Sequence, residues 1–79
     1  MPSDPLPPRV LDRRRAIGER VRAARTAKKP PLTQERLGEL AGLDRKTINR
    51  IEQGTHGTLI DHLILIADVL GVPLADLVR

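Results

Sequence analysis

The segment at residues 32–54, LTQERLGELAGLDRKTINRIEQG, restricts its own folding more than any other part of the chain. Two short helices joined by a tight turn need a small residue where they approach, a turn residue that tolerates positive φ, and apolar anchors on the second helix. Counted from Gln34, the fifth, ninth, fifteenth and eighteenth positions are Gly38, Gly42, Ile48 and Ile51. Gly38 weakens its own helix by about 0.5–1 kcal/mol relative to Ala, so close packing best explains its presence. The spacing therefore predicts two helices that meet at a turn on Gly42.

The rest of the chain predicts further helices and no strand, because no alternating pattern of strand length occurs. The expected helices, with their boundary residues, cover 12–28 after an Asp12 cap, 34–41 after a Thr33 cap, 45–53 between Asp44 and Gly54, 59–70 between Thr58 and Gly71, and a last turn opened by Pro73. The fold class is therefore all-α, a compact domain of five helices. Residues 1–11 are proline-rich and are expected to form a flexible tail, and residues 12–79 form the domain.

Helical spacing also predicts which side chains face the core. The expected inward positions are Val10, Ile17, Val21 and Ala24 on the first helix, Leu37, Leu40 and Ala41 on the second, Leu43, Ile48 and Ile51 around the third, Leu59, Ile60, Leu63, Ile66, Ala67 and Leu70 on the fourth, and Leu74 and Leu77 on the last. With the two isoleucines buried, Arg45, Lys46, Asn49 and Arg50 are expected to face outward. Arg and Lys there can donate to guanine O6 and N7 in a major groove.

Charge and composition narrow the function. Residues 9–29 carry nine Lys and Arg against Asp12 and Glu19, a net charge of +7, which suits a polyanionic partner. The absence of Phe, Trp and Tyr argues against the aromatic RNA-binding modules, and the absence of Cys excludes disulfides and thiolate metal sites. The longest apolar run, 63–67, is too short to span a bilayer, and residues 1–15 do not form a signal peptide. We expect a cytoplasmic protein without metal or cofactor.

The run TQ-x2-LG-x-LAG-x6-I-x2-IE-x-G, followed by IAD-x-LGVPL, resembles the Cro/C1-repressor type (XRE-like) of helix-turn-helix DNA-binding domain over residues 12–78. The resemblance implies that the third helix enters the major groove of double-stranded DNA. It implies base-reading roles for Arg45, Lys46, Arg50 and Asn49, and phosphate contacts for Gln34, Thr47, Gln53, Thr55 and His56. It also implies a structural salt bridge between Arg25 and Glu52.

The sequence departs from the family pattern at three places. Lys29-Pro30-Pro31 is an apparent insertion that could aim Lys28 and Lys29 at a phosphate, and Arg22 is expected to make a similar contact. The loop at 55–58 lacks the usual basic pair and proline. Leu65 replaces a polar residue and, with His62 and Val69, forms a stripe that suggests a homodimer contact.

The function predicted best is a sequence-specific transcriptional regulator, and we expect a repressor that acts as a dimer on a two-fold operator. An alternative is an antitoxin-like module that binds a protein partner through the tail or the Leu65 stripe. An enzyme is not expected, because Ser3 is the only serine and His56 and His62 have no ligand cluster around them.

Overall fold

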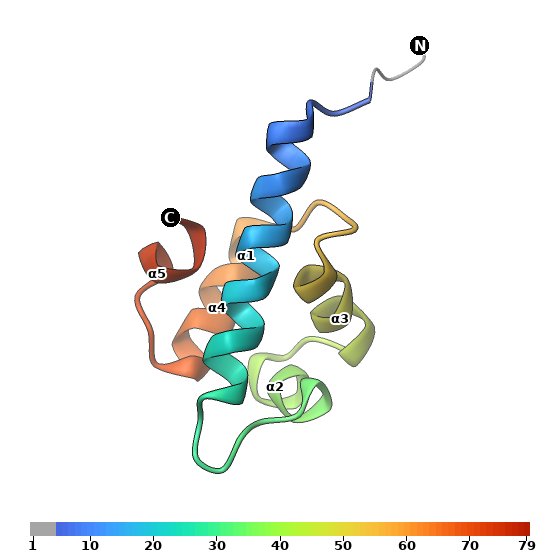
Figure 1. Cartoon of the computed structure of the whole chain (residues 1–79). Coiled ribbons are helices and arrows are strands. Elements are labelled where there is room, and N and C mark those ends of the chain that lie inside the picture. The colour runs from blue at the N-terminus through green and yellow to red at the C-terminus, as the bar shows by residue number, and fades with distance from the viewer. Residues whose placement is uncertain (1–4) are drawn as a thin grey trace.

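The long helix α1, Pro8–Thr26, forms the spine of the fold in the computed structural model, which describes residues 5–79. It is followed by α2 (Gln34–Ala41), α3 (Arg45–Gln53), α4 (Ile60–Leu70) and α5 (Leu74–Val78), with no strand in the described part of the chain. α1 packs against α3, α4 and α5, and α2 packs against α3 and α4. The helices α3 and α5 lie on opposite sides of α1, and the first turns of α1 project beyond the other helices (Figure 1). The predicted all-α fold of five helices is confirmed.

The core is aliphatic and draws on all five helices. Its buried members are Val21, Leu37, Ile48, Ile51, Leu63, Ile66, Ala67, Leu70 and Leu77, and Ile17, Ala24, Leu43 and Leu74 pack partly buried against them. Each fully buried Leu, Ile or Val contributes about 1.5–3 kcal/mol relative to exposure. Because α3 supplies two of these anchors, the core itself decides which face of α3 remains in solvent.

Helix α1 begins earlier than predicted. The expected cap at Asp12 is wrong, because the helix starts at Pro8 and the backbone N–H of Val10 donates to the carbonyl of Pro7 at 2.9 Å. Proline suits the first turn of a helix, where its missing N–H would have no partner inside the helix. Residues 8–11 therefore belong to α1, whereas residues 1–4 of the predicted tail, with Ser3, lie outside the described residues.

At the other end, α1 stops at Thr26, two residues before the predicted end at Lys28. Two apolar residues assigned to the core of α4 are also misplaced. Leu59 is the N-cap of the helix, in place of the predicted Thr58, and its side chain is 63% exposed, while Ile60 is exposed as well. Pro73 is likewise the N-cap of α5 rather than its first residue.

Leu40 is the third misplaced core residue, because it lies on the outer side of α2 and is 47% exposed. Helical spacing groups apolar residues on a face, but it does not say how far round that face the neighbouring helices reach.

Candidate nucleic-acid interface

The turn between α2 and α3 has the predicted geometry. Gly42 ends α2 with φ of 75°, in the left-handed region that glycine adopts at little cost. A Cβ added to Gly38 would lie 2.4 Å from the carbonyl oxygen of Leu43, so only glycine permits this approach. The turn thus holds the two helices at a close, fixed angle.

Both helices of the pair begin at the predicted caps. The Thr33 hydroxyl accepts a hydrogen bond from the backbone N–H of Arg36 at 2.9 Å, and the Asp44 carboxylate accepts one from the N–H of Thr47 at 2.7 Å. The bond from Thr47 lowers the pKa of Asp44 below its ordinary value, helped by the nearby positive charge of Lys46. The Asp44 side chain therefore fixes the N-terminal end of α3.

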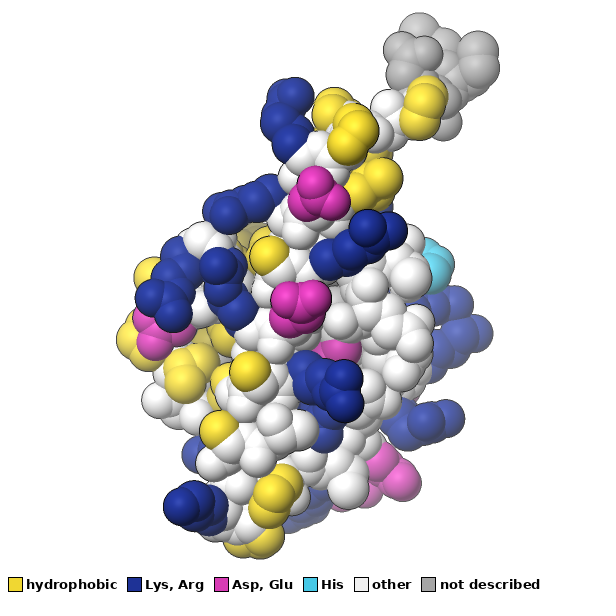
Figure 2. Space-filling model, viewed as in Figure 1, with side chains coloured by type: hydrophobic (Ala, Val, Ile, Leu, Met, Phe, Trp, Pro, Cys, Tyr) yellow, Lys and Arg dark blue, Asp and Glu magenta, His cyan; other side chains and the backbone are white. Residues whose placement is uncertain are grey.

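The outward face of α3 carries three cations. Ile48 and Ile51 are buried, and Arg45, Lys46 and Arg50 are exposed. Lys and Arg side chains project from the edge of the molecule that α3 occupies (Figure 2). This edge presents flexible N–H donors around a rigidly held helix, the arrangement that a major groove accepts.

The predicted salt bridge between Arg25 and Glu52 is confirmed. Arg25 Nε donates to Glu52 Oε2 at 2.7 Å, Arg25 Nη2 donates to Oε1 at 2.9 Å, and Arg25 Nη1 donates to the carbonyl oxygen of Leu32 at 2.7 Å. The two side chains are 12% and 3% exposed. Hydrogen bonding to Glu52 raises the pKa of Arg25, against the opposing effect of burial. The pair ties α1 to the end of α3.

Two further predicted residues join this carboxylate in a polar network. Gln34 Nε2 donates to Glu52 Oε1 at 3.1 Å, and Asn49 Nδ2 donates to Gln34 Oε1 at 3.2 Å. Asn49 was predicted to read bases beside Arg50, but it is half-buried and its amide faces Gln34. The network forms one side of a hollow of about 230 Å³, which Arg22, Arg25, Gln34, Asn49, Glu52 and Gln53 line.

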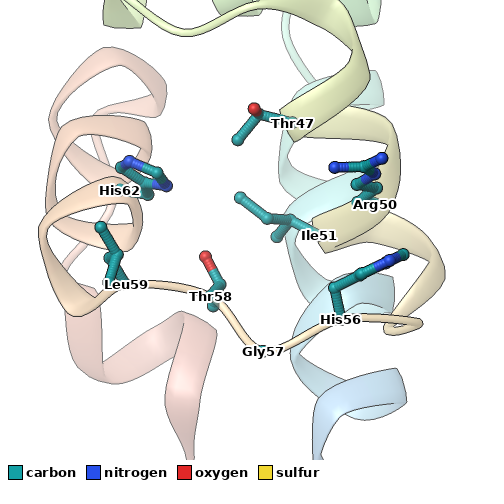
Figure 3. Close-up of a pocket in the computed structure, with 8 residues that line it drawn as sticks. All are labelled: Thr47, Arg50, Ile51, His56, Gly57, Thr58, Leu59 and His62. Atoms are coloured by element: carbon teal, nitrogen blue, oxygen red, sulfur yellow. The ribbon is translucent and has the colours of Figure 1, made fainter.

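A second hollow, of about 350 Å³, lies on the opposite side of α3, against α4. It is lined by Thr47, Arg50, Ile51, His56, Gly57, Thr58, Leu59 and His62. Figure 3 shows His62 and Leu59 on the α4 side, Arg50 and His56 on the other side, and Ile51 between them. His62, predicted as part of a dimer stripe, therefore lines a hollow beside α3. The His56 ring is held by the Thr55 hydroxyl, with 2.9 Å between Oγ1 and Nδ1.

The basic residues of α1 and of the loop that follows it do not form one surface. Arg13 donates to the carbonyl of Val78 at 3.3 Å, and Arg20 donates to the carbonyl of Arg79. Lys28, predicted to contact phosphate, donates to the carbonyl of Leu70 at 3.4 Å, at the C-terminal end of α4. These positive groups lie against the partial negative charge of helix C-termini. Arg13, Arg20 and Lys28 therefore contact helix ends of the fold.

Other cations of residues 9–29 lie near α3 or in solvent. Arg22 lines the smaller hollow beside Gln34, as a phosphate contact would require, and Lys29 is exposed. Sequence reasoning missed Arg14, whose guanidinium would lie 3.0 Å from a Cβ on Gly57, in the loop after α3. Its only sequence signal is its place in the Arg13–Arg15 run, which does not distinguish one arginine from the next.

The outer face of α4 differs from the predicted stripe. Leu65 is exposed, but Val69 packs partly buried against the core. The exposed apolar residues nearby are Leu59, Ile60 and Ile64, and none of these three was predicted to be exposed.

Within residues 5–79, no three His, Asp or Glu side chains come together as a metal site. None of the five helices combines the length and the hydropathy needed to cross a bilayer, as far as the structure describes the chain.

A helix-turn-helix family model, HTH_3, matches residues 21–77. No curated protein matches the sequence. The crystal structure of the restriction-modification controller protein C.AhdI from Aeromonas hydrophila is similar, with a TM-score of 0.78 and 31% sequence identity over 85% of this chain and 94% of that chain.

Proposed function

The chain belongs to the Cro/C1-type (XRE-like) helix-turn-helix family, and on that premise we propose that it is a sequence-specific regulator of transcription that binds double-stranded DNA. The observation that carries the proposal is the orientation of α3: its isoleucines are buried, and Arg45, Lys46 and Arg50 stand in solvent. A module that only bound a protein would not need three outward cations on this helix. The similarity to a controller protein further supports a regulatory rather than a catalytic role.

In the proposed complex α3 enters the major groove and the two hollows beside it receive the two flanking phosphate strands. Arg45, Lys46 and Arg50 donate to base edges. Arg22, Gln34 and Gln53 contact phosphate from the smaller hollow. Thr47 and His56, with Thr55 beside His56, do so from the larger one. The donors of each hollow support this placement, because both sides of the groove are lined by phosphate oxygens. Occupancy of the site then blocks polymerase, which is the repressor role.

A homodimer on a two-fold operator is part of the proposal. A recognition helix contacts few base pairs, so two copies bound about one helical turn apart, ~34 Å, would provide the needed specificity. The exposed apolar residues on and beside α4, Leu59, Ile60, Ile64 and Leu65, support a contact between two copies. Light scattering across a range of protein concentrations tests this: Leu65→Glu should shift the mass toward the monomer, and an unchanged mass contradicts a contact at Leu65.

DNA binding itself is tested by selecting preferred sequences from random duplexes and then titrating three variants. Arg45→Ala should weaken binding to the selected duplex by about 1–3 kcal/mol and relax the base preference at one position. Arg22→Ala should lower the affinity for selected and unrelated duplexes by the same factor, because a phosphate contact carries no base information.

The matched control is Arg13→Ala, which removes the same charge on the side of α1 that faces α5. It should change affinity less than either test variant does. Equal losses for all three variants would show that net charge alone, rather than the α3 face, governs binding.

A further inference from the structure

We propose that Asn49 is a positioning residue for phosphate binding: its amide holds Gln34 so that a free N–H of Gln34 faces the DNA backbone. This inference rests on the proposed function and refines it. It assigns to Asn49 a task different from the base reading expected from its place on α3, and it gives the buried carboxylate of Glu52 a part in DNA binding.

The first step concerns Glu52. An ionised carboxylate only accepts hydrogen bonds. Glu52 accepts two from Arg25, and its Oε1 accepts a third from Gln34 Nε2 at 3.1 Å. With its side chain 3% exposed, Glu52 has almost no access to water as an alternative donor. The carboxylate therefore selects the nitrogen end of the Gln34 amide, since the oxygen end would be repelled.

The second step concerns the other end of that amide. Asn49 Nδ2 donates to Gln34 Oε1 at 3.2 Å, so the oxygen of Gln34 faces α3 and its nitrogen faces Glu52. The two bonds fix both the rotation and the orientation of the amide. Each fails if the amide turns over, because oxygen would then face Glu52 and N–H would face N–H.

The third step is the count of donors. A glutamine amide has two N–H groups. Gln34 uses one for Glu52, and its second N–H has no acceptor among residues 5–79. Gln34 is half-buried beside the hollow that Arg22 also lines. The hollow thus offers an oriented neutral donor next to a guanidinium, a pairing that fits one phosphodiester oxygen pair.

Asn49 is poorly placed to read a base. One of its amide N–H groups donates to Gln34, which holds the side chain toward α2, whereas Arg45, Lys46 and Arg50 are exposed. A side chain acting through Gln34 would affect every DNA sequence equally, because the phosphate is the same at each base pair. This difference separates positioning from reading.

The experiment is a double-mutant cycle in DNA affinity, measured by fluorescence anisotropy with the selected duplex and an unrelated duplex. The test cycle consists of Asn49→Ala, Gln34→Ala and the double variant. The control cycle combines Arg50→Ala with Gln34→Ala in the same way. Alanine favours helix more than asparagine does, so Asn49→Ala keeps α3 folded. Thermal unfolding of each variant checks that it is folded. Asn49→Ser replaces Asn49→Ala in the cycle if the alanine variant is unfolded.

Asn49→Ala should lower the affinity for both duplexes by about fivefold, which corresponds to the loss of one neutral hydrogen bond. It should leave the base preference unchanged and have no further effect when Gln34 is already Ala. The salt dependence should also stay unchanged, because neither side chain is charged. The Arg50 and Gln34 effects should multiply.

Three results would overturn the inference. Independent, multiplying effects of Asn49→Ala and Gln34→Ala would show that the two residues act separately. A loss confined to the selected duplex, with a changed base preference, would make Asn49 a base reader. If the wild-type protein bound no duplex even at low salt, the proposed function would fail and the positioning role with it, a result distinct from the other two.

Discussion

Removal of one partner of the buried Arg25–Glu52 pair should be the most damaging polar substitution in the domain. The side chain of Glu52 is only 3% exposed. In Arg25→Met its carboxylate would keep only the hydrogen bond from Gln34. Breaking a buried pair from one side typically costs about 3–5 kcal/mol. At roughly 0.05–0.15 kcal/mol per residue, a chain of 79 residues has a free energy of unfolding of about 4–12 kcal/mol. The single substitution should thus remove about a quarter of the stability or more.

The double variant Arg25→Met, Glu52→Met should be more stable than Arg25→Met alone, because no charge then remains buried without a partner. Urea unfolding followed by far-ultraviolet circular dichroism measures both, since the chain has no Trp or Tyr to report by fluorescence. Equal m-values would show that the unfolding reaction itself is unchanged. An Arg25→Met variant within about 0.5 kcal/mol of wild type, the usual range of surface substitutions, would refute the reasoning.

Three other substitutions test local features of the fold by thermal or acid unfolding. Thr33→Ala removes the cap of α2 and should cost about 1 kcal/mol, or about 4–8 °C in Tm; no change would mean that the cap is not needed. Gly18→Ala would place a Cβ 2.4 Å from two α3 carbonyl oxygens, and should destabilise by about 1–3 kcal/mol despite the better helix propensity of Ala. Asp44 has a lowered folded-state pKa, so its stabilisation is present at neutral pH and is lost as the pH falls below about 3.9. Asp44→Asn caps without titrating, and wild type should lose stability relative to it in that acid range.

The parts of the fold that were predictable depend on local rules. The helix ends lie where they were predicted, at Thr33, Gly42, Asp44 and Gly54. A cap or a left-handed residue acts on backbone groups within three or four positions, so the local sequence is enough to place it. The outward cations of α3 followed from the buried isoleucines of the same helix. The confirmed Arg25–Glu52 pair, in contrast, came from the family resemblance and not from spacing.

The parts that were missed depend on distant contacts. The bonds of Arg13 and Lys28 reach carbonyls 65 and 42 residues away, and no local pattern indicates where those helix ends lie. Gly18 is different, because a signal existed: glycine within a helix is costly, and the same argument predicted close packing at Gly38. A Cβ on Gly18 would meet the carbonyls of Ile51 and Glu52, so this glycine lets α1 approach α3.

The different surroundings of the cations in residues 9–29 lead to a last prediction, on the salt dependence of DNA binding. Each neutralised phosphate contributes about 0.9 to the slope of log affinity against log salt. Arg22 lines the hollow beside Gln34, whereas the ammonium of Lys28 lies 3.4 Å from the carbonyl oxygen of Leu70. Arg22→Ala should therefore lower the slope by about 0.9. Lys28→Ala should leave it unchanged while lowering the free energy of unfolding, because the end of α4 loses a favourable charge.

The two variants remove the same formal charge, so a protein that bound DNA through net charge alone would respond equally to both. A slope reduced to the same extent by Lys28→Ala and Arg22→Ala would thus contradict the assignment of Lys28 to the fold. It would restore the phosphate contact first predicted for the Lys28–Pro31 region. Unequal slopes would instead separate the cations of residues 9–29 that stabilise helix ends from those that contact the DNA backbone.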